Sequence, residues 1–411
     1  MSVRAAGAAA DRTHATEVRR DRRYLDAAAT APLRPEARAA MLAVLDAGPA
    51  NPSSVHQAGH RAQQTLQAAR AAIASALGAR ESEVVLTSGG TEANNLAIIG
   101  LALAAPRGRH IVTTPIEHPS VLESCRFLER VHGFELSVVP VDAQGSVDPA
   151  AIRAVLRDDT TLVSVGLANA EIGSVQAVPE IAAEARARGA LMHTDAVQAA
   201  ASLPVSFGAG GSGGAGHGAA VWPGPEIDAM TVASHKFGGP QGAGALLVRA
   251  QLPIEALLHG GGQEGGRRSG TENVAAIAGF AAAVTASSHD IGSRALALMR
   301  SRDELVERVL AEVPGAQLTG HPIERLPGHA SFVMTSASGE SLLIALDAAG
   351  FAVSSGSACA AGKDEPSPTL LAMGIPPELA QTAVRFTLAS SLKSAEIERV
   401  VEVLRSEIRS R

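Results

Sequence analysis

The stretch EVVLTSGGTE, residues 83–92, decides the fold class of this chain. Its first half is an apolar, β-branched run that predicts a strand, and its second half is a glycine turn that opens an apolar helix reaching Leu103. A turn of this kind exposes backbone N–H groups at a helix start, where the helix dipole favours an anion. An ordinary N-cap and turn explains the same residues more readily when they are taken alone. The stretch therefore predicts α/β structure and leaves a phosphate site open.

Short apolar runs alternate with helix-length segments on both sides of this stretch, from about residue 56 to 250. This alternation predicts an α/β fold with a large, mainly parallel mixed sheet. A helix is expected at 56–77, and strands are expected at 83–87, 110–113, 135–139, 161–165, 190–193 and 227–233.

The pattern changes near residue 290, where long amphipathic helices appear with a strand at 329–334 between them. We expect a second, smaller α+β domain there. The predicted division is a disordered tail at 1–22, a large domain at 33–290 with a flexible insertion at about 207–226, and a small domain formed by 23–32 and 291–411.

Composition excludes several classes of function. The 411 residues have a net charge of −6 and a pI of about 6.1, without the concentrated basic face that a nucleic-acid partner needs. No stretch of 18 residues is wholly apolar and free of charge, so no membrane span is expected. Two cysteines make no disulfide framework, and residues 1–22 lack the apolar region of a secretory signal. We expect a reducing, cytoplasmic setting.

Lysine is scarce, which draws attention to each one: Lys236, Lys363 and Lys393 are the three lysines among 35 basic residues. Lys236 follows the strand predicted at 227–233 and precedes a glycine-rich turn. A lysine at a strand end can reach into a cleft, where loss of solvation favours the neutral amine that forms a Schiff base. A surface lysine beside a loop fits the segment equally well. The other two lie among charges or at a helix start and are interpreted as solvated groups.

Two further polar residues follow predicted strands. Asp195 comes after the strand at 190–193, and a carboxylate there points into the ligand crevice of a parallel sheet. A helix N-cap is the alternative. His118 comes after the strand at 110–113, where an imidazole can stack on a ring and move protons near neutral pH. A lone histidine is more often structural or exposed.

The two cysteines differ in their surroundings. Cys359 lies in the small, polar stretch SSGSACAAG, residues 354–362, which suits a nucleophilic thiol on a mobile loop. Cys125 lies in a helical segment and is interpreted as a packed thiol.

In this order, the segments resemble one known family from Tyr24 to the C-terminus. The chain is similar to the cysteine desulfurases of iron–sulfur cluster assembly (NifS/IscS-like), which are fold-type I, class V aminotransferase-like transferases that use pyridoxal 5'-phosphate. The motifs that carry the resemblance are YLD at 24–26, NPSSVH at 51–56, TSGGTE at 87–92, EH at 117–118, EIG at 171–173, HTDAVQ at 193–198, SHK at 234–236, RSGT at 268–271, SSGSAC at 354–359 and RF at 385–386.

The resemblance implies a role for each residue at these motifs. Lys236 would hold the cofactor as a Schiff base, and His118 would stack on its ring and shuttle protons. Asp195 would pair with the pyridinium nitrogen and Gln198 with the ring hydroxyl. The phosphate would be bound by Gly90, Thr91, Ser234 and His235, with Thr271 reaching across from the second subunit of a homodimer.

The resemblance also implies the reaction and its partners. Arg385, with Asn169, would bind the carboxylate of L-cysteine. The Cys359 thiolate would then take the substrate sulfur as a persulfide and release L-alanine. The sulfur would pass to an acceptor protein for iron–sulfur cluster or other cofactor biosynthesis, with a cluster contact possible through Cys359 during transfer. No metal site is expected.

Three positions depart from the family pattern. Ala170 stands where a second asparagine is usual, Gly265 stands where a basic residue is common, and Ala389-Ser390 replaces Gly-Arg. A lost hydrogen bond of this kind is worth on the order of 1 kcal/mol, which is too little to undo covalent cofactor binding. A selenocysteine lyase or a class V aminotransferase is the alternative on the same fold. A non-catalytic scaffold is the alternative from another class.

Overall fold

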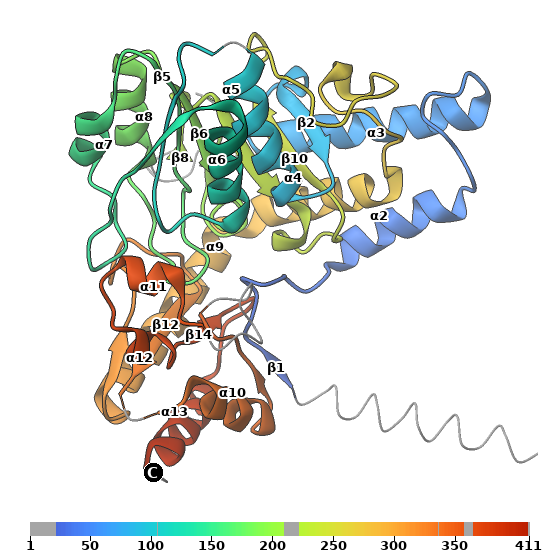
Figure 1. Ribbon diagram of the computed structural model, residues 1–411. Helices are drawn as coiled ribbons and strands as arrows, with labels where there is room; N and C mark the ends of the chain where they lie inside the picture. The colour runs from blue at the N-terminus through green and yellow to red at the C-terminus, as the bar shows by residue number, and fades with distance from the viewer. Residues whose placement is uncertain (1–21, 105, 209–221, 336, 357–364, 410–411) are drawn as a thin grey trace, which may run out of the picture.

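The computed structural model describes residues 22–104, 106–208, 222–335, 337–356 and 365–409. Its centre is a seven-stranded sheet in the order β2-β10-β9-β6-β5-β3-β4 (Figure 1). β10 runs antiparallel to its neighbours β2 and β9, and the other neighbouring pairs are parallel. This confirms the predicted α/β fold with a mainly parallel mixed sheet. The strands are β2 (Val84–Thr87), β3 (His110–Thr113), β4 (Glu135–Val138), β5 (Thr160–Ser164), β6 (Leu191–Asp195), β9 (Ala229–Ala233) and β10 (Gly244–Val248).

Helices cover both faces of this sheet because its strands are apolar on both sides. In β2, Val84 and Leu86 pack into one core and Val85 into the other. The first core is closed by α3 (Gln57–Ala76), which matches the helix predicted at 56–77, and by α8 (Val178–Ala187) and the start of α9 (Val274–Glu312). The second core is closed by α4 (Gly90–Asn95), a π turn (Leu96–Gly100), α5 (Leu101–Ala104) and α6 (Pro119–His132). The remaining helices of this part are α2 (Pro35–Asp46) and α7 (Pro149–Val155).

The carboxyl ends of the strands meet at one edge of the sheet. β2, β3, β6 and β9 all point the same way, since β10 reverses the direction twice between β9 and β2. The turn at Gly89 therefore lies at the same edge as the segments that follow β3, β6 and β9. Those segments carry His118, Asp195 and Lys236.

A smaller unit with its own core lies below the sheet in Figure 1. Its three-stranded antiparallel sheet has the order β11-β12-β14, and its core is separate from the two cores of the large sheet. The N-terminal strand β1 (Arg23–Tyr24) pairs with β13 (Phe351–Ala352), which ties the start of the described chain to this unit. The other elements are β11 (Ala316–Leu318), β12 (His329–Met334), β14 (Val384–Thr387), α10 (Gly339–Ala348), α11 (Pro368–Ala372), α12 (Pro377–Ala380) and α13 (Ser394–Arg409).

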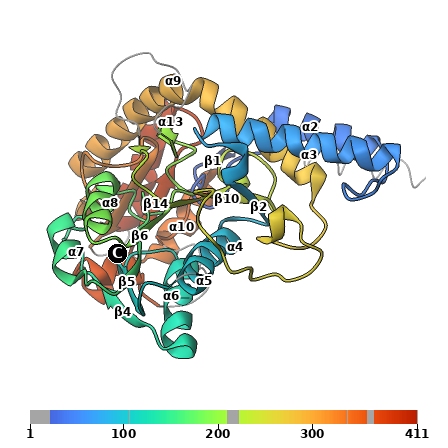
Figure 2. The ribbon, with the colours of Figure 1, turned by 90° about the horizontal axis from the view of Figure 1, so that it is seen from above.

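The 39-residue helix α9 passes without a break from the large unit to the small one. Figure 2 shows it running along one side of the molecule, beside α2 and α3. The predicted domain boundary at 290/291 falls inside this helix, and the division into domains stays a prediction. By length and composition α9 could cross a membrane. In this structure Ile277 and Phe280 pack in the core of the sheet, and Leu305 and Val309 pack in the core of the small unit.

The predicted tail and most of the predicted insertion lie outside the described residues. The flanks of the insertion lie side by side, because β7 (Val205–Ser206) pairs in parallel with β8 (Trp222–Pro223).

Candidate active site

A cavity of about 340 Å³ lies at the carboxyl edge of the large sheet. Its walls come from the segments after β2, β3, β5, β6 and β9 and from β14 of the small unit. The structure thus brings together residues spread over almost the whole chain. The residues predicted from the sequence that line it are Gly90, Thr91, His118, Asn169, Asp195, Gln198, His235, Lys236 and Arg385.

Two predicted site residues do not line this cavity, and a third lies outside the described residues. Ser234 is fully buried, and its hydroxyl has no hydrogen-bond partner in the described part of the chain. It faces Gly239, where an added Cβ would lie 2.2 Å from Ser234 Oγ. Thr271 is exposed and does not line the cavity of this chain. Cys359 lies outside the described residues.

Lys236 lies in the single 3₁₀ turn Ser234–Lys236 that follows β9. Its Nζ donates hydrogen bonds to the carbonyl oxygens of Ala28 and Ala29, the latter at 2.8 Å. Gln198 Nε2 donates to the same Ala28 carbonyl at 3.0 Å. The amine is therefore held at the cavity wall by the backbone of the N-terminal segment.

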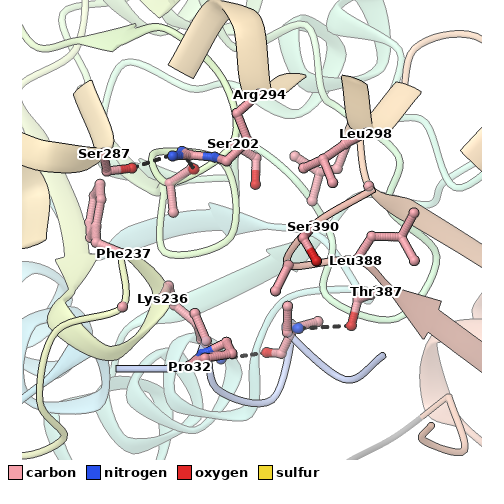
Figure 3. A pocket seen from close by; sticks show the side chains of 18 of the residues that line it. Pro32, Ser202, Lys236, Phe237, Ser287, Arg294, Leu298, Thr387, Leu388 and Ser390 are labelled. Carbon is pink, nitrogen blue, oxygen red and sulfur yellow. Dashed lines mark hydrogen bonds between the residues drawn. The ribbon is translucent and has the colours of Figure 1, made fainter. Parts of the chain in front are cut away.

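A second cavity of about 450 Å³ lies on the other side of Lys236. Ala28, Gln198 and Lys236 line both cavities, so they form the wall between them. Figure 3 shows the second cavity with Arg294 bound to Ser287 at one end and Thr387 at the other. Ser390, one of the residues that depart from the family pattern, lines this cavity and not the first.

The carboxylate of Asp195 is fixed at both oxygens. Oδ1 accepts a hydrogen bond from the backbone N–H of Val197 at 2.9 Å, and Oδ2 accepts one from Asn94 Nδ2 at 2.7 Å. Asn94 is buried in α4, and its Nδ2 also donates to Ser120 Oγ at 2.9 Å. Asn94 is not among the residues predicted from the sequence. Its spacing of four residues from Gly90, one helical turn, was the available signal.

His118 caps the N-terminus of α6, directly before Pro119. Its Nδ1 accepts a hydrogen bond from the backbone N–H of Ser120 at 3.1 Å, and Ser120 Oγ lies 2.7 Å from the same nitrogen. Since Nδ1 accepts from a backbone N–H, the neutral ring carries its proton on Nε2. The cap thus leaves Nε2 as the nitrogen available for proton transfer.

Glu117 is a second residue of the site for which no sequence pattern predicted a role. It lines the cavity beside His118, with Oε1 accepting from Thr114 Oγ1 at 2.6 Å and Oε2 from the Gly166 N–H at 2.8 Å. Burial, with a further contribution from the charge of Asp195, raises the pKa of Glu117 to about 8. At neutral pH this carboxyl group therefore stays mostly protonated, and Asp195 is left as the negative charge between them.

We expect Glu117→Gln to change how stability depends on pH. Because the folded state keeps a proton that the unfolded state loses above pH 4.5, the free energy of unfolding should fall as pH rises from about 5 to 8. Glutamine has no proton to lose in this range, so the free energy of unfolding of the variant should not fall for this reason. The variant should therefore be more stable than wild type at pH 8 by on the order of 1–3 kcal/mol. Urea unfolding of cofactor-free protein between pH 5 and 8.5 measures this. Glu123→Gln, at an exposed position on α6, is the control. Parallel pH profiles for wild type and Glu117→Gln would contradict the assignment.

Two histidines are kept neutral, His235 in the cavity wall and the fully buried His193 of β6. Burial lowers the pKa of His193 to about 4, and its two ring nitrogens lie 2.9 Å from Ser164 Oγ and 3.0 Å from Thr231 Oγ1. Burial and then the charge of Lys236 lower the pKa of His235 to about 4. Neither ring therefore carries a positive charge at neutral pH.

Arg385 closes the cavity from the side of the small unit. It is 1% exposed, and its Nη1 donates to the carbonyls of Ala170 and Gly356, both at 3.1 Å. Its Nη2 forms an ion pair with Asp26 at 2.8 Å. Ala170 thus contributes its backbone where the family pattern has an amide side chain. Asn169 Oδ1 accepts from the N–H of Glu171 at 2.7 Å, which fixes the turn that presents this carbonyl.

The backbone conformation explains why glycine stands at position 265, where a basic residue is common in the family. Gly265 has a φ of +66°, in the left-handed region that strains a residue with a side chain. Glu264 before it also has a positive φ, of +52°, and is held by Arg70 at 2.6 Å and by the N–H of Leu86 at 2.8 Å.

The described residues contain no cluster of three or more His, Cys, Asp or Glu side chains that could hold a metal ion.

Comparisons with known proteins agree with this geometry. Residues 23–400 match the model of the family "Aminotransferase class-V". The chain is 39% identical to a protein of Dictyoglomus turgidum named cysteine desulfurase IscS, over 93% of this chain and 95% of that one. It is 42% identical to the IscS-like cysteine desulfurase of Mycobacterium tuberculosis over the same shares of both chains. Among solved structures it is similar to a NifS-like protein, with a TM-score of 0.83 and 30% identity over 95% of this chain and all of that one.

Proposed function

Because the chain belongs to the aminotransferase class-V family and, within it, to the cysteine desulfurases, we propose that it converts L-cysteine to L-alanine and takes the sulfur onto Cys359. One observation carries the proposal. A single cavity gathers an amine, a carboxylate and a buried guanidinium from three separate elements, Lys236, Asp195 and Arg385. A thiol on Cys359 is the group that distinguishes a desulfurase from a transaminase, which needs no thiol there.

The residues of the cavity fit pyridoxal 5'-phosphate, the cofactor of this family. A Cβ at Gly90 would lie 2.9 Å from Val197 Cγ2, so glycine lets the start of α4 pack closely against Val197, and both residues line the cavity. Thr91 and His235 lie at the same wall and suit the phosphate. Asn94 lines the cavity, and its Oδ1 is buried without a partner among the described residues, as expected of a polar group that a bound ligand would contact.

We assign the binding roles as follows. Lys236 Nζ would hold the cofactor covalently, Asp195 would face the ring nitrogen and Gln198 the ring hydroxyl. When bound, pyridoxal 5'-phosphate draws electrons away from the substrate's Cα and so makes its proton acidic. Asp195 supports that role because its negative charge is fixed by Val197 and Asn94. The phosphate would be held by Gly90, Thr91, Ser234 and His235, with the partner subunit's Thr271 completing the site in a homodimer.

The chain's own groups then orient the substrate and move its protons. Arg385 would bind the carboxylate of L-cysteine, with Asn169 beside it, and so place the Cα proton and the thiol toward the centre of the cavity. Lys236 is a base within the cavity, and the neutral ring of His118, with its proton on Nε2, is a proton donor. His118 would exchange its proton through Nε2, because Nδ1 is occupied by the Ser120 N–H.

The Cys359 thiolate would attack the substrate sulfur. An S–S bond forms, the C–S bond breaks with its electron pair left on carbon, and a proton completes the methyl group of alanine. The persulfide sulfur would then pass to an acceptor protein for iron–sulfur cluster or other sulfur-containing cofactor synthesis. We further propose that the enzyme is cytoplasmic.

Cys359→Ala tests the proposal against a matched control in the same chain. With L-cysteine as substrate, the variant should lose sulfide release by about a hundredfold or more, because no other thiol can take the sulfur. Cys125→Ala should keep the wild-type rate, because burial raises the pKa of the Cys125 thiol to about 12 and leaves it unreactive. Wild-type sulfide release by Cys359→Ala would reject the persulfide route. Selenocysteine in parallel would show whether the chain is instead a selenocysteine lyase.

A further inference from the structure

The short turn formed by residues 26–29 contacts both ends of the candidate site. The N–H of Ala29 donates to the carbonyl of Asp26 at 3.0 Å, which closes the turn. Asp26 binds Arg385 through its side chain, and the carbonyls of Ala28 and Ala29 bind Lys236 Nζ. One rigid turn therefore links the group proposed to bind the substrate carboxylate with the group proposed to hold the cofactor.

We propose that Asp26 is a positioning residue, which holds the guanidinium of Arg385 in the orientation that binds the substrate carboxylate. This inference rests on the proposed function. It goes beyond that function by assigning a residue that does not itself touch the substrate.

The hydrogen bonds of Arg385 leave two of its five N–H groups to bind a carboxylate. The two on Nη1 are taken by backbone carbonyls and one on Nη2 by Asp26. The second N–H of Nη2 and the N–H of Nε remain, and Nε is buried without a partner within the described residues. Their position depends on the rotation of the whole guanidinium group, which the contact with Asp26 fixes together with the two carbonyls.

The surroundings of Arg385 explain why a carboxylate is needed beside it. Arg385 is 1% exposed, so water does not stabilise its charge. Burial and the nearby charges of Arg325 and Arg385 lower the pKa of His329, so the neighbouring ring is neutral. Burial raises the pKa of Glu171, which weakens the other nearby acid as a counter-charge. Asp26 is the acid that forms an ion pair with Arg385 within the described residues.

Asp26 is itself held in place by the backbone. Tyr24 Oη donates to the Asp26 carbonyl at 2.9 Å, and residue 26 forms a parallel bridge with Thr387 of β14. Its side chain is only 20% exposed. Both partners of the ion pair are therefore fixed before any substrate arrives, and the cost of ordering Arg385 is met in folding.

The test compares ligands with and without a carboxylate on the full chain loaded with cofactor. Visible absorbance is titrated with L-alanine, which has the amine and the carboxylate, and with L-alaninamide, which has the amine alone. Asp26→Ala should weaken L-alanine binding by about ten- to a hundredfold, the range for a lost hydrogen bond to a charged group. It should change L-alaninamide binding by less than about twofold. The KM for L-cysteine should rise by a similar factor as L-alanine affinity falls, and kcat should change less.

Three further variants make the result decisive. Asp26→Asn keeps an acceptor for Nη2, so it should recover part of the L-alanine affinity even if Asp26→Ala folds poorly. In an Arg385→Gln background, Asp26→Ala should have little further effect on L-alanine binding. Asp347→Ala removes an exposed ion pair with Arg22 in the same small unit and should leave both affinities unchanged.

Equal weakening of L-alanine and L-alaninamide, or no weakening of either, would overturn the inference. The outcome is separable from that of the proposed function. A chain that binds L-alanine in this way but releases no sulfide would reject the desulfurase reaction and keep the role of Asp26. The opposite outcome is also distinguishable. If sulfide release depends on Cys359 as expected but Asp26→Ala leaves the ligand selectivity unchanged, the desulfurase reaction is kept and the role of Asp26 is rejected.

Discussion

Lys236→Ala should abolish covalent cofactor attachment and reduce alanine formation from L-cysteine by on the order of a thousandfold or more. Among the described residues the cavity offers no other lysine amine, because Lys393 does not line it. The variant also leaves the carbonyl of Ala29 without its donor, at a cost of about 1–3 kcal/mol if water does not replace it. Loss of activity should therefore be accompanied by a small loss of stability.

Lys236→Arg separates these two effects. Arginine keeps the positive charge and the N–H donors, so much of the stability should return, but it does not form the covalent bond and activity should stay lost. Lys393→Ala, at an exposed position before α13, should behave as wild type. The measurements are visible absorbance and peptide mass after borohydride reduction, with alanine formation assayed in parallel. A cofactor adduct found on any peptide other than the one containing Lys236 would refute the assignment.

Asp195→Asn should lower alanine formation by about 10²–10³-fold while the protein keeps its fold and its colour. The loss follows from charge, because Asp195 is the residue proposed to supply the negative charge at the ring nitrogen. Glu117 does not replace it, since burial raises the pKa of Glu117 to about 8 and keeps it mostly protonated at neutral pH. The fold should tolerate the change because Asn94 has a free acceptor: its amide can turn so that the unpartnered Oδ1 receives the new N–H.

Asp228→Asn is the matched control for this prediction. Asp228 is another carboxylate of the same sheet, bound to the N–H of Met192 at 2.8 Å and outside the cavity lining. Asp228→Asn should affect thermal stability more than the rate of alanine formation. Alanine formation at saturating L-cysteine and thermal unfolding are measured for both variants. Equal losses of turnover in the two would mean that the charge of Asp195 has no special role.

Local sequence patterns predicted most of the strands, because each depends on neighbouring residues. β3 and β12 begin and end where the apolar runs at 110–113 and 329–334 do. β6 continues to Asp195, two residues beyond the apolar run, because it pairs with β9 as far as Thr231. β9 begins at Ala229, two residues late, because the side chain of Asp228 binds the neighbouring strand at Met192. These shifts depend on partners that a local pattern does not contain.

The residues of the candidate site also fall into those that a local pattern could predict and those that it could not. Lys236, Asp195 and His118 could be predicted because each follows a strand, and parallel strands end at one edge. Asn94, Glu117 and Asp26 could not be assigned roles, because their importance lies in contacts with distant residues. Asn94 meets Asp195 across 101 positions, and Asp26 meets Arg385 across 359. No spacing rule relates such residues until the sheet brings them together.

The turn at residues 26–29 also sets when the site can form during synthesis. Asp26 leaves the ribosome early, but its partner Arg385 follows 359 positions later. At elongation rates of about 5–20 residues per second, roughly 20 to 70 seconds separate the two. The strand that precedes the turn must likewise wait for residues 351–352, because β1 pairs with β13. The large sheet can assemble on the nascent chain, whereas the wall behind Lys236 closes only when translation is nearly complete. Newly made chains therefore gain their cofactor pocket last.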